Sequence, residues 1–172
     1  ENETAIVLST KSVTASVSRR TGNISFIAHN DVVMTEAGRE FEPAVVMAES
    51  CYHLRQSFGY RSGEKLYGLG NYQDADLPLN GKKRTMIQRN RDDVVPVIVS
   101  TAGYGIVWDN YSLGEFNDTR GGYYLWSEAG DEVRYTFVYG PAMDSIVASY
   151  RRSTGAAPMY AKPFYGYIQS KQ

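Results

Sequence analysis

The chain has 172 residues, enough for one or two domains with a buried core. Its 18 basic and 19 acidic side chains leave a net charge of −1, which argues against nucleic acid or an anionic membrane surface as a partner. The single cysteine, Cys51, excludes an intrachain disulfide and a cysteine zinc site, and no apolar run is as long as a membrane span.

Short segments that alternate apolar and polar residues follow one another along the chain, separated by turn signals, as in an antiparallel β-sandwich. The predicted strands are residues 4–9, 12–18, 23–28, 31–35, 43–48, 51–58, 84–90, 95–101, 104–110, 122–128 and 132–140. Residues 95–101, VPVIVST, are almost continuously apolar and predict a central strand buried on both faces. Residues 63–70, GEKLYGLG, are glycine-rich and are expected to turn.

Only residues 141–155, PAMDSIVASYRRSTG, predict a helix. Pro141 suits a first helical turn, and Gly155 suits a helix end. At helical spacing, the residues expected to face the core are Met143, Ile146, Val147 and Tyr150.

The chain ends on a predicted strand, residues 164–169, which follows Pro163. Because no partner strand follows it in the sequence, two interpretations are open. It is either an edge strand of the sandwich or the first strand of a further domain.

Residues 71–84 form a polar loop that is too long for a simple hairpin. It carries an aromatic side chain, amides and carboxylates, the mixture that sugar sites use to pack on C–H surfaces and to bond hydroxyls. The candidate residues are Tyr72, Gln73, Asp74, Asp76 and Asn80. A ligand role and an ordinary polar loop both remain open on the residues alone.

The other chemical signals have structural interpretations. His29 and His53 lack the spacing of metal ligands or of a catalytic pair, so no metal site and no cofactor are predicted. The acids of RNRDD, residues 89–93, are expected to cap or to form salt bridges. Trp108 is expected in the core, at a strand end before a turn.

Four stretches together resemble the start of glycoside hydrolase family 31, above all its bacterial α-xylosidases and α-glucosidases. They are LYGLGNYQD, VPVIVSTAGYGIVWDNYS, YTFVYGPAMDSIVASYRRSTGAAPM and FYGYIQSK. The resemblance implies an all-β fold: an antiparallel galactose-mutarotase-like sandwich over residues 1–157 with one C-terminal helix. Residues 158–172 then begin a truncated (β/α)₈ barrel, with Phe164 to Ser170 as its first strand.

The resemblance also implies a retaining, exo-acting α-glycosidase as the parent protein, of periplasmic or secreted bacterial origin. Such enzymes use two carboxylates, one as nucleophile and one as acid/base. Both belong to later barrel strands, so no catalytic residue is assigned here, and the chain alone is expected to be inactive. The sandwich would contact the barrel and add a loop to the rim of the sugar pocket. Rim residues implied for an oligosaccharide substrate are Gln73, Asp74, Asp76, Gln169 and Ser170.

Other functions compete with this interpretation. A free-standing carbohydrate-binding sandwich would need its own aromatic platform. An aldose mutarotase would need a His/Glu pair in one groove, and neither histidine has such a partner by sequence spacing. A structural domain that forms homo-oligomers is the remaining alternative.

Overall fold

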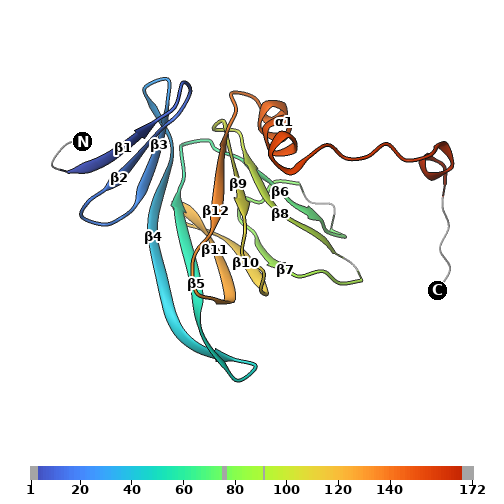
Figure 1. Cartoon of the computed structure of the whole chain (residues 1–172), viewed down its shortest axis with the longest axis horizontal. Helices are drawn as coiled ribbons and strands as arrows, with labels where there is room; N and C mark the ends of the chain where they lie inside the picture. Colours follow the sequence, from blue (N-terminus) through green and yellow to red (C-terminus); the bar gives the residue numbers. More distant parts are fainter. Residues whose placement is uncertain (1–3, 75–76, 91, 168–172) are drawn as a thin grey trace.

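The computed structural model describes residues 4–74, 77–90 and 92–167, which form a β-sandwich with one helix and a C-terminal tail (Figure 1). The first six strands are β1 (Ala5–Ser9), β2 (Thr14–Ser18), β3 (Ile24–Ala28), β4 (Asp31–Val46), β5 (Glu49–Gly59) and β6 (Leu66–Asn71). The next six are β7 (Lys83–Met86), β8 (Asp93–Ser100), β9 (Tyr104–Trp108), β10 (Gly114–Thr119), β11 (Gly122–Gly130) and β12 (Tyr135–Tyr139). Helix α1 (Met143–Thr154) and a 3₁₀ helix, η1 (Lys162–Tyr165), follow.

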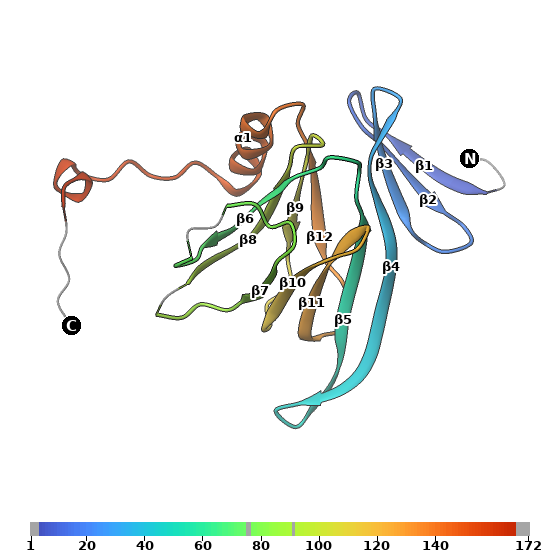
Figure 2. The ribbon, with the colours of Figure 1, turned by 180° about the vertical axis from the view of Figure 1, so that it is seen from behind.

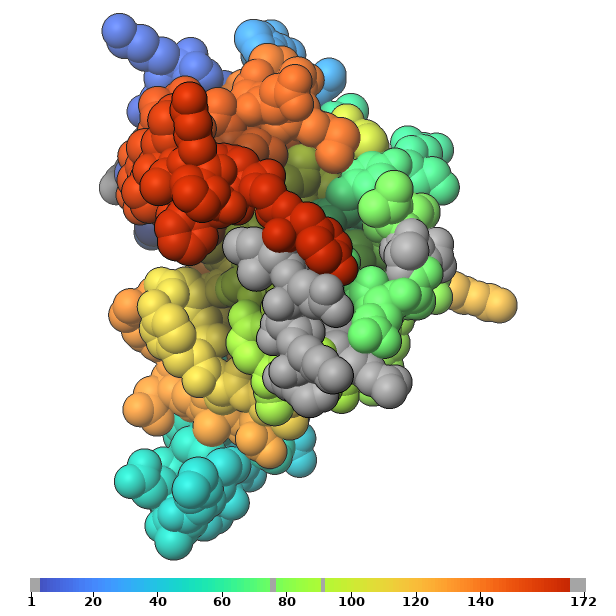
Figure 3. All heavy atoms as spheres, turned by 90° about the vertical axis from the view of Figure 1, so that its right-hand side faces the viewer, coloured from blue at the N-terminus to red at the C-terminus, as the bar shows by residue number. Residues whose placement is uncertain are grey.

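The strands make two antiparallel sheets. The larger sheet has the order β1-β2-β3-β4-β5-β11-β10-β7, and the smaller has the order β12-β9-β8-β6. Strand β4 is long because its first half pairs with β3 and its second half with β5. Viewed along the tail, the cyan β4–β5 hairpin reaches beyond the rest of the sandwich (Figure 3). The predicted sandwich is thus confirmed.

Aromatic side chains fill the space between the sheets. Phe58 of β5 and Tyr123 of β11 stack with ring centroids 5.0 Å apart, and both are buried. Tyr104 of β9, in the other sheet, lies with its hydroxyl oxygen 3.1 Å from that of Tyr123. Near the N-terminal strands, Phe26 and Phe137 stack at 3.9 Å. The core therefore joins strands from both sheets through ring contacts, which contribute beyond their buried area.

Two buried carboxylates lie in this core. Glu64 accepts hydrogen bonds from the hydroxyls of Ser100 and Tyr104, both at 2.6 Å. Glu36 accepts from the hydroxyl of Tyr135 at 2.5 Å and from the guanidinium of Arg39 at 3.1 Å. A buried charge is tolerated only when it is paired or hydrogen-bonded, and both carboxylates meet this condition.

The sequence YGLG forms part of strand β6 rather than the predicted turn. Gly68, Leu69 and Gly70 have positive φ angles of 118°, 64° and 97°, and the β6–β8 register shifts between Gly68 and Leu69. A β-bulge explains both features, because the extra residue needs a left-handed backbone that glycine adopts without strain. At Gly70 a Cβ atom would lie 1.9 Å from the Asp93 carbonyl oxygen. These glycines let the strand bend and continue.

Three other strand predictions differ from the structure. Residues 31–35 and most of residues 43–48 are parts of the single strand β4, because the intervening polar residues stay paired with β5, and residues 47 and 48 form the turn that follows. Strand β10 was missed because only Phe116 interrupts its polar sequence GEFNDT. Burial of β8 on both faces holds only at its C-terminal end, since Val95 is 45% exposed while Ile98 and Val99 are buried.

Helix α1 packs across one end of the sandwich, against β8, β9 and β12. Of the expected buried residues, only Ile146 is buried, whereas Val147 is 53% exposed. The helix contacts the sheets at their ends, so a single side chain suffices to anchor it and a continuous apolar stripe is not covered.

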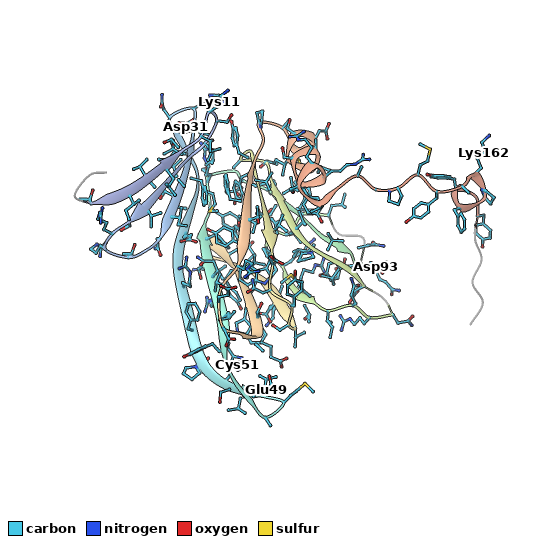
Figure 4. All side chains as sticks on the ribbon, in the orientation of Figure 1. Lys11, Asp31, Glu49, Cys51, Asp93 and Lys162 are labelled. Carbon is cyan, nitrogen blue, oxygen red and sulfur yellow. The ribbon has the colours of Figure 1, made fainter. Side chains whose placement is uncertain are left out.

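The predicted final strand is not found over residues 164–167, where η1 occupies Lys162–Tyr165 with Pro163 in its first turn. Within the described residues no strand pairs with this segment, so its backbone groups have no ladder to join, and a 3₁₀ turn satisfies some of them locally. The tail leads away from the sandwich in the reverse view (Figure 2), and Lys162 lies far from the core (Figure 4). Residues 168–170 of the predicted barrel strand lie outside the described residues.

No helix in the described part of the chain is long and apolar enough to cross a membrane. The same residues contain no group of three or more His, Cys, Asp or Glu side chains arranged to hold a metal ion.

The bulge predicts that two glycines with positive φ differ in how much an alanine substitution destabilises the fold. Gly70→Ala should lower the free energy of unfolding by about 3 kcal/mol or more, because its methyl group meets backbone atoms of β8. Gly81→Ala, with φ of 76° and open space around its Cβ, should cost about 1 kcal/mol, the strain of a left-handed alanine. Urea denaturation of both variants measures this, and equal losses would contradict the bulge argument.

Alkaline pH should destabilise the fold through its buried tyrosines. Burial raises the pKa of Tyr104 far above its ordinary value of 10.0, and the charges of Tyr123 and Glu64 raise it further. The unfolded chain therefore releases this proton near pH 10 while the folded chain keeps it, so stability is lost as pH rises above about 10. Tyr104→Phe should reduce the fall in unfolding free energy between pH 10 and 11 by about 1 kcal/mol, because the unfolded chain releases the proton only partly in that range. Tyr167→Phe, at an exposed position, is the control and should leave the slope unchanged.

Candidate functional site

A polar hollow lies where the loop after β6 meets the edge strand β7. Its volume is about 640 Å³. We call it the loop hollow; its lining residues are Tyr72, Gln73, Asp74, Lys83, Arg84, Thr85, Arg89, Asn90 and Asp92. Asp93, labelled in Figure 4, begins β8 directly after the last of these residues.

Arg84 organises one wall of the loop hollow. Its guanidinium lies 2.5 Å from the Asp74 carboxylate and 4.8 Å from the centre of the Tyr72 ring, so an ion pair and a cation–π contact hold it together. The Tyr72 hydroxyl donates to the Thr85 carbonyl at 3.3 Å. Burial raises the pKa of Tyr72, which stays protonated and can donate. The Arg84 side chain is only 13% exposed, so this wall is rigid and charged.

A second ion pair also lines the loop hollow. The Arg89 guanidinium lies 2.5 Å from the carboxylate of Asp92, as the sequence predicted for the acids of RNRDD. The two backbones also exchange hydrogen bonds between Arg89 and Asp92, which closes a tight turn. Gln73 and Asn90 add amide groups to the same lining.

This arrangement suits binding better than bond cleavage. Each carboxylate in the lining, Asp74 and Asp92, is held by an arginine, whereas glycoside hydrolysis needs one carboxyl group free to attack and one free to give a proton. Guanidinium, carboxylate and amide groups around one hollow can form charge-assisted hydrogen bonds with sugar hydroxyls.

The structure brings together three of the candidate residues, Tyr72, Gln73 and Asp74, in the loop hollow. Asp76, Gln169 and Ser170 lie outside the described residues. Asn80 has a structural role instead, because its amide oxygen accepts from the Leu66 backbone at 3.0 Å and its nitrogen donates to the Glu64 carbonyl at 3.2 Å.

Sequence reasoning missed the cationic lining of the loop hollow. Arg84 ends the basic run GKKR, residues 81–84, and its side chain is largely buried. A basic residue directly before the apolar pattern of a strand was the available signal, but the aromatic ring beneath it belongs to Tyr72, at the other end of the loop over residues 71–84.

Comparison with known proteins identifies the family of the chain. No family model matches it. It is 41% identical over 132 residues to an alpha-xylosidase of Saccharolobus solfataricus, a match that covers 72% of this chain and 18% of that protein. It is 34% identical over 134 residues to an uncharacterized family 31 glucosidase of Pseudescherichia vulneris, covering 78% of this chain and 25% of the relative. The chain belongs to glycoside hydrolase family 31.

The fold agrees with this family. The chain superposes with a TM-score of 0.83 on a family 31 alpha-xylosidase from a soil metagenome, solved in complex with xylose, at 25% identity. That match covers 94% of this chain and 27% of the other. The family 31 chain described here thus spans about a fifth to a quarter of the length of the curated relatives it matches.

The ion pair between Asp74 and Arg84 should contribute more to stability than an ion pair that is fully on the surface. A double-mutant cycle with Asp74→Asn and Arg84→Met should give about 0.5–1 kcal/mol, because Arg84 is largely buried. The Glu132–Arg134 pair, more than half exposed on both sides, is the matched control and should give near zero. Urea denaturation of the unsubstituted chain and of the six variants measures both values, and equal couplings would show that Asp74 does not fix the arginine.

Proposed function

We propose that this chain is the non-catalytic N-terminal β-sandwich domain of a retaining exo-acting α-glycosidase, an α-xylosidase or α-glucosidase. In this proposal the domain supports the catalytic barrel, and the loop hollow forms part of the rim of the sugar pocket. The observation that carries it is the placement of Gln73 and Asp74, together with Arg84, in one polar hollow of a domain that belongs to family 31.

The surface after α1 supports contact with a further domain. Large apolar side chains in this segment are mostly exposed, and apolar groups that gather on a surface mark interaction sites. They are Met159, Tyr160, Phe164, Tyr165 and Tyr167. A catalytic barrel that follows the sandwich would bury them, and this would also give the segment neighbouring strands with which to pair.

At the rim of the pocket, the loop hollow contacts the leaving group of the substrate. It does not contact the sugar ring that is cleaved off. Hydroxyls of an oligosaccharide leaving group can bond to the Asp74 carboxylate and the Gln73 amide, whereas an aryl leaving group offers no such hydroxyls. A hydrogen bond to a charged group contributes about 1.5–3 kcal/mol. Substrate length should therefore reveal the contact.

In the full-length protein, Gln73→Ala and Asp74→Ala should each lower kcat/KM on oligosaccharides, for Asp74 by about ten- to a hundredfold. Both variants should keep kcat/KM on aryl α-glycosides within about twofold of the unsubstituted protein. Asp144→Asn on α1 is the control and should change neither. Steady-state kinetics on matched oligosaccharide and aryl substrates decides the matter, and equal losses on both would refute the rim contact.

A further inference from the structure

A second hollow, of about 290 Å³, lies on the outer face of the larger sheet, away from the core. We call it the sheet hollow; its lining residues are Glu40, Glu42, His53, Arg55, Glu115, Tyr124 and Trp126. These residues come from four strands that neighbour one another, β4, β5, β11 and β10. The rim role proposed above does not use any of them.

The sheet register builds this hollow. Glu40 is directly opposite Arg55, Arg55 is opposite Trp126, and Trp126 is opposite Glu115, which makes one row across four strands. A second pair, Glu42 opposite His53, lies beside that row. Because side chains alternate along a strand, these residues point outward while their neighbours Leu54, Leu125 and Phe116 are buried in the core.

Contacts within the hollow hold its walls in place. The Arg55 guanidinium lies 4.0 Å from the centre of the Tyr124 ring and 3.6 Å from the Glu40 carboxylate. The Tyr124 hydroxyl donates to Glu115 at 2.8 Å, and Lys83 pairs with the same carboxylate at 2.7 Å. The site is thus arranged before any ligand arrives, which lowers the entropy that binding must overcome.

The hydrogen bond of His53 fixes its tautomer. Its Nδ1 atom lies 2.5 Å from the backbone carbonyl oxygen of Glu128, which can only accept, so Nδ1 carries the proton. In the neutral ring, Nε2 then presents a lone pair. The imidazole lies 5.5 Å from the Trp126 ring, tilted by 42°. The sequence spacing gave His53 no acidic partner, but the strand register places Glu42 directly across from it.

The charges disfavour an anion, and the groups left without a partner suit a ligand rich in hydroxyl groups. Lys83 and Arg55 offset Glu115 and Glu40, whereas Glu42 forms no ion pair with any described residue. A remaining carboxylate repels anions. A cation would gain little from the Tyr124 ring, because Arg55 already covers it. What remains is an indole, a free carboxylate and an imidazole lone pair, which suit the C–H face and the hydroxyl donors of a sugar ring.

We propose that the sheet hollow is a carbohydrate-binding site for a neutral pyranose, separate from the loop hollow. The sugar packs on Trp126, and its hydroxyls donate to the carboxylate of Glu42 and to Nε2 of His53. Because the sheet hollow is complete within this chain, the proposal does not depend on the rim role of the loop hollow.

The two tryptophans allow a direct test on the 172-residue chain. Trp108 is buried, as the sequence predicted, and its indole donates to Ser127, so Trp126 is the indole that a ligand can reach. Titration with methyl α-glucoside, methyl α-xyloside and maltotriose should change the tryptophan fluorescence and saturate at millimolar sugar. The same titration with tetramethylammonium chloride and with sodium glucuronate should give no saturable change.

Variants assign the response to the sheet hollow. Glu42→Gln and His53→Ala should each weaken binding about three- to tenfold, and Trp126→Ala should weaken it at least tenfold by calorimetry, which needs no indole signal. Trp126→Phe keeps a flat ring in the case that the alanine variant does not fold, and should retain part of the affinity. Glu132→Gln, an exposed carboxylate outside the hollow, is the matched control and should bind like the unsubstituted chain.

Three outcomes would overturn the proposal. The first is no saturable response to any of the neutral sugars in fluorescence and calorimetry. The second is a saturable response to tetramethylammonium alone, which would make this a cation site. The third is sugar binding that stays unchanged in Glu42→Gln and Trp126→Phe but is lost in Asp74→Ala, which would place the bound sugar in the loop hollow. If the kinetic test of the rim role fails, the three outcomes keep the same meaning, because the sheet hollow uses none of the residues proposed for the rim.

Discussion

Hydrogen bonds to Glu64 position both the sandwich core and the loop hollow, the first through its buried carboxylate and the second through its backbone carbonyl. The carboxylate accepts hydrogen bonds from Ser100 of β8 and Tyr104 of β9, and Tyr104 reaches Tyr123 in the opposite sheet. Ser100 and Tyr104 both belong to the smaller sheet, so these bonds tie β8 and β9 to the segment before β6 and satisfy the buried carboxylate. The carboxylate thus fixes the hydroxyl of Tyr104, and that hydroxyl makes the contact with the larger sheet.

The same residue also positions the loop. Asn80 donates to the Glu64 carbonyl and accepts from the Leu66 backbone, which fixes where the loop after β6 returns to the sheet. Strand β7 starts three residues later, and with it comes the guanidinium of Arg84 that lies over Tyr72. A core interaction therefore sets the geometry of a surface hollow through one asparagine.

The sequence predicted what depends on local pattern and missed what depends on register. Alternation identified most strands, the helix and the burial of Trp108, because each of these follows from residues close together in the chain. The bulge at Gly68–Gly70 imitates a turn, since both need a left-handed backbone. The neighbours of Trp126 come from three other strands, and only their pairing reveals that they share one face. For the same reason the loop hollow was half predicted: Gln73 and Asp74 are adjacent in sequence, but their arginine is not.

The ion pair between Lys83 and Glu115 has a consequence for how this domain can change. Lys83 lines one hollow and Glu115 lines the other, on adjacent strands at the edge of the larger sheet. A mutation that removes the charge of Lys83 leaves Glu115 with only the hydrogen bond from Tyr124 and so shifts the electrostatic potential of both surfaces at once. Gln73 has no such link to the sheet. Divergence of ligand preference in one hollow, by evolution or by engineering, is therefore least constrained at Gln73 and most constrained at Lys83, where the two surfaces have to adapt together.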